Sequence, residues 1–353
     1  MELRIIHIGI GIRGRQWLEL IKDYPEITSV ACVDADSRAL DEAKGTYGST
    51  ACQYYNDVGT ALRAVEADAA LIASPSSLHS EHALKALEAG LAVMIEKPFA
   101  SSIEEARQII ERATEVNKPV IVAEQFRFVP AERTVRKLVQ DGMLGQITSV
   151  TFIDRRRMPS HTQGLWMATM QYPQLQEIAV HHFDSLRSFF TRRPISMMAR
   201  VWNPPWSDYQ HGACTEAMIE MEDGIHIQYL GTLTSHRYAY SVWIEGEHGV
   251  LWTNRKIVMW RARGKKLFWP ARRVKVPKGD DAPFPREGSI SLLNGLRDAL
   301  LYGEKPETSG EDNIWTLAMV EAGKRSAAEG RLVPIEEVLP DSILPQKVQE
   351  EVA

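Results

Sequence analysis

The sequence predicts an α/β fold: a doubly wound parallel sheet of the Rossmann type, followed by an α+β domain with a large, mainly antiparallel open sheet. Three observations predict it. Short apolar runs alternate with helical patterns as far as Pro130, a glycine-rich turn follows the first run, and runs rich in aromatic and β-branched residues dominate after Pro130. The alternation is typical of a parallel sheet, and the change of pattern indicates a second domain.

The first half of the chain predicts strands and helices in turn. The predicted strands are Leu3–Ile8, Ile27–Val33, Ala69–Ala73, Leu91–Ile95 and Val120–Ala123. The first predicted helix begins at Arg13. The other predicted helices are Ser37–Lys44, Asp57–Val65, Ser80–Ala89 and Ile103–Val116. Ser102 and Glu105 have the spacing of a capping box at the start of the last of these helices.

The second half predicts one helix, then strands, then two more helices. The first helix is Ala131–Asp141, and the predicted strands are Ile147–Phe152, Met197–Trp202, Ala217–Met221, Ile225–Leu233, Ala239–Glu245, Val250–Thr253 and Lys256–Trp260. The late helices are Leu292–Tyr302 and Ile314–Glu329, and the last is a candidate for packing back on the first domain. We expect a dinucleotide-binding domain at 1–125 and a substrate-binding and oligomerisation domain at 126–353.

Composition limits the classes of function. The chain has 353 residues, 44% of them apolar, and a formal net charge of −5, which disfavours a nucleic-acid binder with a broad basic face. It contains no apolar run of about eighteen residues, and its first residues enter a strand at once, so we expect a cytoplasmic protein without a membrane anchor. Cys32, Cys52 and Cys214 have no C-x-x-C spacing and no companion histidine cluster, so we expect small buried residues, no disulfide framework and no metal site.

The turn Gly9-Ile10-Gly11-Ile12-Arg13-Gly14 has the G-x-G-x-x-G spacing of a dinucleotide-binding loop. The spacing alone is weak, but here it lies between a predicted strand and a predicted helix, as the motif requires. The first glycine permits the tight turn, the second lets a pyrophosphate approach the backbone, and the third lets helix pack on strand. We expect the cofactor to be bound by Gly9, Gly11, Ile12, Arg13 and Gly14.

Asp34 follows the second predicted strand, about 20 residues after the last glycine of the loop. An acidic side chain there binds the ribose hydroxyls of NAD and repels the 2′-phosphate of NADP. The cofactor is therefore expected to be NAD, although the nearby Arg38 could meet a phosphate and keeps NADP open as the alternative.

Lys97 lies in the tripeptide Glu96-Lys97-Pro98, directly after the apolar run Leu91–Ile95. The carboxyl ends of parallel strands are where such sheets bind ligands, and Pro98 restricts Lys97 to extended backbone geometry. The direction of the Lys97 side chain is therefore restricted, and its amine is a candidate for proton transfer. Glu96 could orient this amine or a hydroxyl group of the cofactor. The alternative is an ordinary surface lysine.

A second polar group lies near residue 180. On a helix at 100° per residue, Glu177, His181 and Asp184 share one face, opposite an apolar face that includes Phe183 and Leu186. The group could bind substrate. It could also be a solvated face with an ordinary Glu–His pair, and a metal site lacks a further ligand motif.

Together these residues resemble the glucose-fructose oxidoreductase, inositol dehydrogenase and rhizopine-catabolism (Gfo/Idh/MocA) family. The resemblance covers nearly the whole chain. It rests on the glycine loop, Ser74–His79, Glu96-Lys97-Pro98, Arg127-Phe128 and the late stretch from Glu321 to Arg331.

The resemblance implies roles for single residues. Lys97 would be the proton-transfer lysine, with His181 and Asp184 at the substrate's reacting hydroxyl. Residues along the cofactor would be Ser74, Pro75 and His79, with Gln125 and Arg127 near its nicotinamide end. This chain departs from the family where many members have glycines and then an Asp four residues before the histidine. It has Pro173-Gln174-Leu175-Gln176 and then Glu177, so the substrate cannot be borrowed from a relative.

Other residues are candidates for the substrate pocket. The aromatic side chain of Trp166 could pack on a sugar, and His182 is a further polar candidate. Arg155 and Arg157 would point to one side of a strand, where Arg157 could bind an anionic group, although a solvated edge explains them as well.

These observations predict an NAD-dependent oxidoreductase that oxidises a secondary hydroxyl of a sugar, polyol or glycoside bound between the domains. Two alternatives remain: redox-neutral glycoside hydrolysis through transient oxidation, elimination and re-reduction, and a non-catalytic NAD sensor. An open sheet rich in Trp, Ile and Val would expose an apolar face, so we expect a homo-oligomer.

Overall fold

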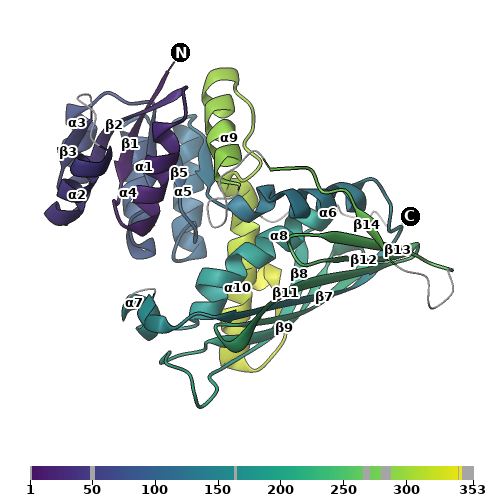
Figure 1. The fold of residues 1–353 in the computed structure, drawn as a ribbon. Helices are drawn as coiled ribbons and strands as arrows, with labels where there is room; N and C mark the ends of the chain where they lie inside the picture. Colours follow the sequence, from purple (N-terminus) through teal and green to yellow (C-terminus); the bar gives the residue numbers. More distant parts are fainter. Residues whose placement is uncertain are drawn as a thin grey trace, which may run out of the picture. The chain divides into compact units, whose positions relative to one another are not determined.

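The computed structural model (Figure 1) describes residues 2–47, 52–162, 165–264, 271–279, 288–340 and 342–343. Its contacts divide the chain into two compact units. The first unit contains residues 1–134 and 276–317, and the second contains 135–275 and 318–353. We expected two domains continuous in sequence, divided at 125/126. The units are instead both discontinuous, because residues 276–317 belong with the first.

The first unit contains a six-stranded sheet and its helices. The strands are β1 (Leu3–Ile8), β2 (Ile27–Val33), β3 (Gln53–Tyr55), β4 (Ala69–Ile72), β5 (Ala92–Ile95) and β6 (Val120–Val122). The helices are α1 (Ile12–Lys22), α2 (Ser37–Tyr47), α3 (Val58–Ala64), α4 (His79–Glu88), α5 (Ile103–Glu115), α9 (Ser289–Tyr302) and the short η1 (Ser76–Leu78) and η2 (Gln125–Phe128). One half of the predicted capping box is present at α5, where the Glu105 backbone N–H donates to Ser102 Oγ, and the Glu105 carboxylate accepts from the Ser101 N–H.

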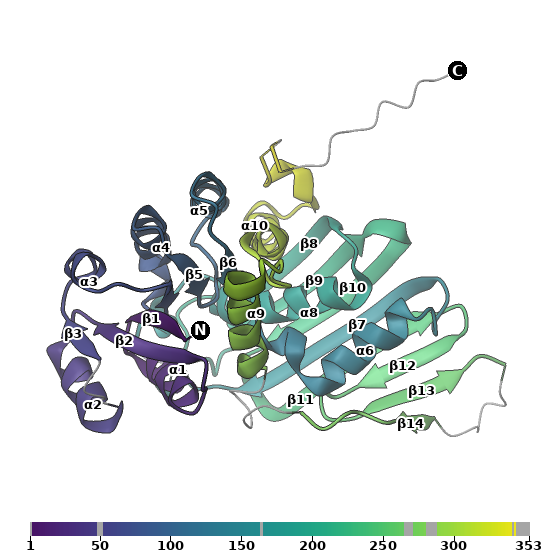
Figure 2. The same ribbon diagram turned by 90° about the horizontal axis from the view of Figure 1, so that it is seen from above.

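All strand pairs in this sheet are parallel, in the order β3-β2-β1-β4-β5-β6. Figure 2 shows helices on both faces, with α1 and α2 on one and α3, α4 and α5 on the other. The sheet is the predicted doubly wound sheet. The chain direction across the sheet reverses between β1 and β4, and at this point such folds bind ligands beyond the carboxyl ends of the strands.

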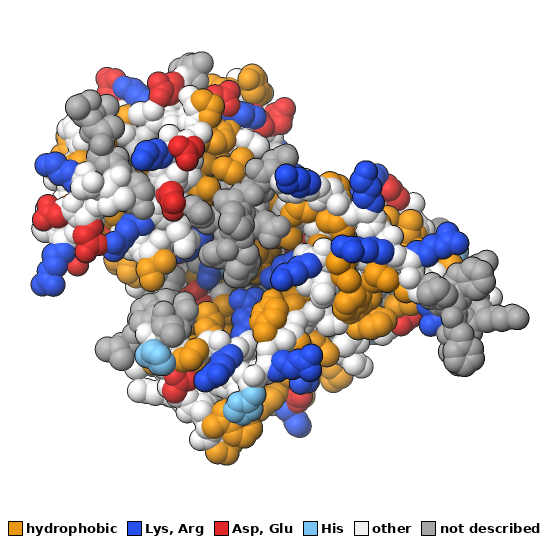
Figure 3. All heavy atoms as spheres, viewed as in Figure 1, with side chains coloured by type: hydrophobic (Ala, Val, Ile, Leu, Met, Phe, Trp, Pro, Cys, Tyr) orange, Lys and Arg blue, Asp and Glu red, His pale blue; other side chains and the backbone are white. Residues whose placement is uncertain are grey.

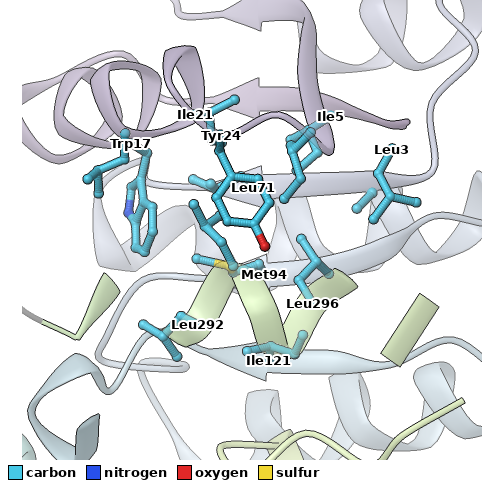
Figure 4. Close-up of a cluster of buried hydrophobic side chains, with 14 of the residues drawn as sticks. Leu3, Ile5, Trp17, Ile21, Tyr24, Leu71, Met94, Ile121, Leu292 and Leu296 are labelled. Carbon is cyan, nitrogen blue, oxygen red and sulfur yellow. The ribbon is translucent and has the colours of Figure 1, made fainter. Parts of the chain in front are cut away.

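The core of the first unit explains why α9 joins it. Leu292, Leu293 and Leu296 of α9 are buried against apolar side chains of the sheet and of α1. Figure 4 shows Leu292 and Leu296 beside Met94 and Ile121. Sequence analysis assigned this late helix to the second domain, because an apolar stripe does not tell which surface it will cover.

The second unit contains a nine-stranded sheet. Its strands are β7 (Ile147–Arg157), β8 (Pro194–Trp202), β9 (Cys214–Met221), β10 (Ile225–Thr232), β11 (Thr234–Gly246), β12 (Gly249–Thr253), β13 (Val258–Ala262), β14 (Arg272–Val274) and β15 (Val333–Pro334). Its helical segments are α7 (Leu165–Thr169), α8 (Val180–Phe190), the π-helical η4 (Gln174–Ala179) and the short η3 (Ser160–Thr162), η5 (Glu222–Gly224) and η6 (Ile335–Glu337). The helices α6 (Pro130–Gln140) and α10 (Gly310–Glu329) each contain a division between the units.

The strand order of this sheet is β14-β13-β12-β11-β7-β10-β9-β8-β15, with antiparallel pairs except for the parallel pair β10 and β7. The predicted large, mainly antiparallel sheet is confirmed. Figures 1 and 2 show α6 and α8 along one of its faces. On the face drawn in Figure 3, hydrophobic side chains lie among Lys and Arg over this unit, whereas acidic and basic side chains are interspersed over the first. Within the described ranges, every helix is too short or too polar to cross a membrane.

Candidate functional site

The predicted cofactor residues all follow the carboxyl ends of strands of the parallel sheet. The glycine loop follows β1, Asp34 follows β2, and Ser74 follows β4. Glu96 and Lys97 follow β5, and Gln125 follows β6. Because the strands are parallel and adjacent, their ends form one edge of the sheet, and the sequence prediction placed these residues at that edge correctly.

The three glycines of the loop differ in whether protein packing requires a glycine at that position. Gly9 has φ +91, and a Cβ there would overlap the backbone of Ser74, so the turn after β1 passes directly against the turn after β4. A Cβ at Gly14 would overlap the Gly9 carbonyl, so α1 packs closely on the loop. A Cβ at Gly11 would meet no atom of the described residues within 4 Å. Protein packing therefore requires Gly9 and Gly14 and leaves the space beside Gly11 open.

The amino end of α1 is suited to an anion. Its N-cap residue is Gly11, so no side chain caps the first backbone N–H groups, and its first turn holds no acidic residue. Ile12, the first residue of the helix, is 72% exposed. The first turn of α1 thus presents backbone N–H groups that could donate hydrogen bonds to a pyrophosphate.

Asp34 is held beside this loop by backbone groups. Its Oδ2 accepts from the Ile10 N–H at 2.7 Å, and its Oδ1 accepts from the Asp36 N–H at 2.9 Å. These bonds fix the carboxylate at the carboxyl end of β2, and each oxygen keeps a second lone pair for a hydroxyl group. The backbone N–H of Arg38 donates to Asp36, and the Arg38 side chain is exposed on α2.

Arg13 points inward, to the strand end that carries Lys97. Its Nε and Nη2 donate to Glu96 Oε1 at 2.9 and 2.6 Å, and Trp17 Nε1 donates to the same oxygen at 2.8 Å. Burial would raise the pKa of Glu96, but the Arg13 charge and these hydrogen bonds hold it below its ordinary value. Glu96 therefore stays ionised and joins the start of α1 to the end of β5. The Arg13 side chain is held in this ion pair, and the expected role of Arg13 in cofactor binding stays a prediction.

His79 also holds the edge together. Its Nδ1 lies 2.8 Å from the Pro98 carbonyl and its Nε2 lies 3.0 Å from the Ser74 carbonyl, and the side chain is 1% exposed. The imidazole therefore links the turn after β4 to the turn after β5. Ser74 Oγ lies 3.0 Å from His82 Nδ1, and Pro75 is exposed at the rim of this turn.

Lys97 lies beside a carboxyl group that sequence analysis did not select. Ile95 pairs with Val122 at the ends of two adjacent strands, Lys97 and Glu124 each follow two residues later, and the charge of Lys97 acts on Glu124. Burial raises the pKa of Glu124 to about 7, against the opposing charges of Lys97 and Arg127. Glu124 is fully buried, whereas Lys97 is partly exposed. The signal that could have found Glu124 is its place directly after a buried strand, the same signal that indicated Lys97.

The two residues expected at the nicotinamide end are buried next to Glu124. Gln125 is 5% exposed, and its Oε1 has no hydrogen-bond partner among the described residues. Arg127 donates from Nη2 to Asp312 Oδ2 at 2.7 Å and from Nη1 to the Glu307 carbonyl at 3.0 Å. Arg127 thus binds the segment before and at the start of α10, which points to a structural contribution beside its expected one.

In the second unit, the predicted polar group lies on buried helix. Glu177, His181 and Asp184 are 6%, 5% and 1% exposed, so the alternative of a solvated face is wrong. Glu177 belongs to the π-helical turn η4, which precedes α8, so the spacing of 100° per residue does not hold across the segment. Single π-turns are frequent at functional sites. Every residue of α8 is buried, which an amphipathic pattern does not predict.

His182 belongs to a buried polar network between α8 and the sheet. Its Nδ1 lies 2.9 Å from the Tyr229 hydroxyl, which also accepts from Gln174, and its Nε2 lies 3.6 Å from Asp154 Oδ2. Burial, together with the nearby charge of Arg156, holds the pKa of His182 well below its ordinary value. Both ring nitrogens have protein neighbours, so we leave His182 out of the substrate site.

Asp154 is the charged centre of that network. It is fully buried, and its Oδ2 accepts from Arg156 Nε at 2.6 Å. Burial raises the pKa of Asp154, against the charges of Arg156 and Arg255. Arg155 and Arg157 are exposed on one side of β7, as the alternation of side chains predicted, and Arg156 between them turns inward.

Two remaining expectations concern Trp166 and metals. The backbone of Trp166 lies in α7, and its side chain is outside the described residues. Among the described residues, no three His, Cys, Asp or Glu side chains are arranged to hold a metal ion.

The chain matches family models over both units. Residues 3–124 match the model of the oxidoreductase family with an NAD-binding Rossmann fold, and residues 133–252 match the GFO/IDH/MocA C-terminal domain. Among curated relatives, the D-apiose dehydrogenase of Paraburkholderia graminis is 26% identical, covering 93% of this chain and 88% of its own length. The inositol 2-dehydrogenase of Rhizobium meliloti is 24% identical, covering 95% and 100%.

A solved structure has the same fold. An oxidoreductase from Agrobacterium radiobacter, in complex with NAD+, L-tartaric acid and magnesium, superposes with a TM-score of 0.87 at 20% identity, covering 96% of this chain and 100% of that one. The family models and the solved structure agree with the observed strand order and with the two-unit architecture. The chain belongs to the GFO/IDH/MocA oxidoreductase family, with an NAD-binding Rossmann domain at its amino end.

Proposed function

We propose that this protein is an NAD-dependent oxidoreductase that oxidises a secondary hydroxyl of a sugar or polyol, with Lys97 as the group that accepts the hydroxyl proton. The observation that carries the proposal is that Lys97 and the glycine loop lie at the same carboxyl edge of one parallel sheet. Named relatives that act on apiose and inositol support the substrate class.

The residues present fit NAD. A pyrophosphate could bind in the open space beside Gly11, at the uncapped first turn of α1. The fixed carboxylate of Asp34 could bind the hydroxyls of a ribose. Bound NAD would supply the hydride acceptor. Asp34 is the residue that should discriminate against a 2′-phosphate, so Asp34→Ala should weaken NAD binding and reduce the preference over NADP. Asp41→Ala, which removes an exposed carboxylate of α2, is the matched control and should leave both affinities unchanged.

The proton chemistry is assigned to side chains of the first unit. Lys97 Nζ takes the proton of the reacting hydroxyl, as a general base positioned at a strand end does. Burial raises the pKa of Glu124 to about 7 and the charge of Lys97 opposes this shift, so Glu124 is proposed to take up a proton from the amine during turnover. His181, Asp184 and Glu177 are proposed to bind the substrate hydroxyls. Their support is the family resemblance and their position on a buried helix that begins with a π-turn.

The test is a substrate screen that follows two products. Purified protein with NAD would be offered pentoses, inositols, other polyols and glycosides while reduced nicotinamide absorbance and glycoside cleavage are recorded together. The proposal expects NADH to accumulate with at least one polyol or sugar. Cleavage of a glycoside without NADH would identify the redox-neutral hydrolase instead, and NAD binding without turnover of any compound would identify a sensor.

Homo-oligomerisation and a cytoplasmic location are further parts of the proposal. Outward-facing side chains on the sheet face opposite α8 are aligned by the strand register into one row. The row contains Met198, Met218, Gln228, Thr151, Trp243, Trp252 and Met259. Met218 and Trp243 are 63% and 45% exposed, and the Trp243 and Trp252 rings lie 5.9 Å apart. A second copy of the chain could cover this row.

Light scattering after gel filtration tests the association. Met218→Glu and Trp243→Glu should shift the protein towards monomer. Tyr302→Glu places the same charge on a comparably exposed side chain of α9 and should not. A monomeric wild type would refute the association. Cell fractionation tests the location.

A further inference from the structure

Two of the three cysteines form a close pair at the edge of the parallel sheet. Cys32 lies on β2 and Cys52 directly precedes β3, and their Sγ atoms are 3.7 Å apart. The register brings them together, because Cys32 pairs with Tyr54, two residues beyond Cys52 on the same side of the strand. The sequence predicted small buried residues and no disulfide framework, because the cysteines have no C-x-x-C spacing.

The two thiols differ in environment. Cys32 is 1% exposed and packs among apolar side chains of α1 and α2, whereas Cys52 is partly exposed. The hydrogen bond with Cys32 lowers the pKa of Cys52, against the effect of burial, and the same bond together with burial raises the pKa of Cys32. Cys52 is therefore the thiol that an oxidant can reach and that ionises first, and Cys32 is a second thiol within reach of it.

We propose that Cys32 and Cys52 are a redox pair that a hydroperoxide converts to an intramolecular disulfide. The Cys52 thiolate attacks the peroxide, the O–O bond breaks, and Cys52 becomes a sulfenic acid while the peroxide is reduced to an alcohol, or to water from hydrogen peroxide. The Cys32 sulfur then attacks the sulfenic sulfur, the S–O bond breaks, and a second water leaves with the Cys32 proton. The two thiols together lose two electrons and two protons.

The location gives the disulfide a consequence for the cofactor site, which rests on the proposed function. Cys32 is two residues before Asp34 on the same strand end, and its side chain packs in one cluster with Ile10 of the glycine loop. The Ile10 N–H is the donor that holds the Asp34 carboxylate. Drawing the two sulfur atoms from 3.7 Å to a bonding distance of about 2 Å moves the backbone next to that carboxylate. Oxidation should therefore weaken NAD binding.

Mass spectrometry of the full chain tests the disulfide itself. Reduced protein is treated with hydrogen peroxide, then denatured and alkylated. The expected product has lost about 2 Da, retains one alkylatable cysteine, and gives a peptide that links Cys32 to Cys52. Cys214→Ser should lose the same mass, because Cys214 lies in the other unit, with its Sγ 3.1 Å from the Thr232 hydroxyl. Cys32→Ala should instead stop at a sulfenic acid on Cys52 that dimedone captures. Three alkylatable thiols, or only oxygen adducts, in the treated wild type would overturn the proposal.

NAD titration of the reduced and oxidised wild type tests the consequence. The oxidised form should bind NAD about fivefold or more weakly, and reduction with dithiothreitol should restore the affinity. Equal affinities in the two forms would overturn the link to the cofactor site. Reduced protein that does not bind NAD would instead count against the proposed function and leaves the mass measurement as the test of the pair.

Discussion

The carboxyl edge of the six-stranded sheet and the buried face of α8 carry the candidate residues in two different ways. At the sheet edge, each residue follows a different strand, and the parallel order brings them together. On α8, the polar residues are close in sequence and lie within a helix that is buried on all sides. The first arrangement depends on topology, which local patterns reveal. The second depends on what surrounds the helix, which they do not reveal.

The largest effect is expected from the buried charge beneath α8. Asp154→Ala removes the carboxylate that accepts from Arg156 at 2.6 Å and leaves the guanidinium without its partner. We expect a loss of about 3 kcal/mol in the free energy of unfolding, measured by chemical denaturation. Arg155→Ala, on the same strand but exposed, should change it by no more than about 0.5 kcal/mol. Equal effects of the two substitutions would show that the network does not stabilise the second unit.

Two glycines of the cofactor loop separate packing from ligand binding. Gly14→Ala places a Cβ against the Gly9 carbonyl and should destabilise the fold by about 1–3 kcal/mol. Gly11→Ala meets no protein atom and should leave the thermal midpoint nearly unchanged while it weakens NAD binding. Calorimetric melting and NAD titration of both variants provide the comparison. Normal NAD affinity in Gly11→Ala would contradict a pyrophosphate at this loop.

A smaller effect concerns the pH dependence at the sheet edge. The pKa of Glu124 is about 7, above its ordinary value of 4.5, so between these two pH values the folded state binds more protons than the unfolded state. Stability contributed by this group is present below about pH 4.5 and is lost as the pH rises through about 7. Glu124→Gln should therefore flatten the decline of the thermal midpoint between these pH values. Glu115→Gln, on the exposed surface of α5, should not alter it. An unchanged decline in Glu124→Gln would place the titration elsewhere.

Most of the sheet edge could be predicted from the sequence because glycine spacing, strand periodicity and the residues after each strand are local signals. Asp34 and Lys97 were found in this way. Glu124 carries the same signal and was overlooked. The inward turn of Arg13 towards Glu96 could not be predicted, because it joins residues 83 positions apart.

Less of the second unit could be predicted from the sequence. The π-helical turn that contains Glu177 changes the directions of its side chains relative to those of an α-helix, and local residue patterns do not predict such a turn. His182 of α8 lies beside Asp154 of β7, so the burial of this pair depends on packing between segments that are far apart in the sequence. Residues 276–317 belong to the first unit for the same reason, because their place depends on packing between segments far apart in the sequence.

The most direct test of the account is the steady-state and binding behaviour of Lys97→Met on a substrate found in the screen. Methionine keeps most of the side-chain volume and removes the amine. The account expects turnover to fall by about 10²- to 10⁴-fold while the NAD dissociation constant stays within about twofold of the wild type. Unchanged turnover, with NAD still bound, would contradict the assignment of proton transfer to Lys97.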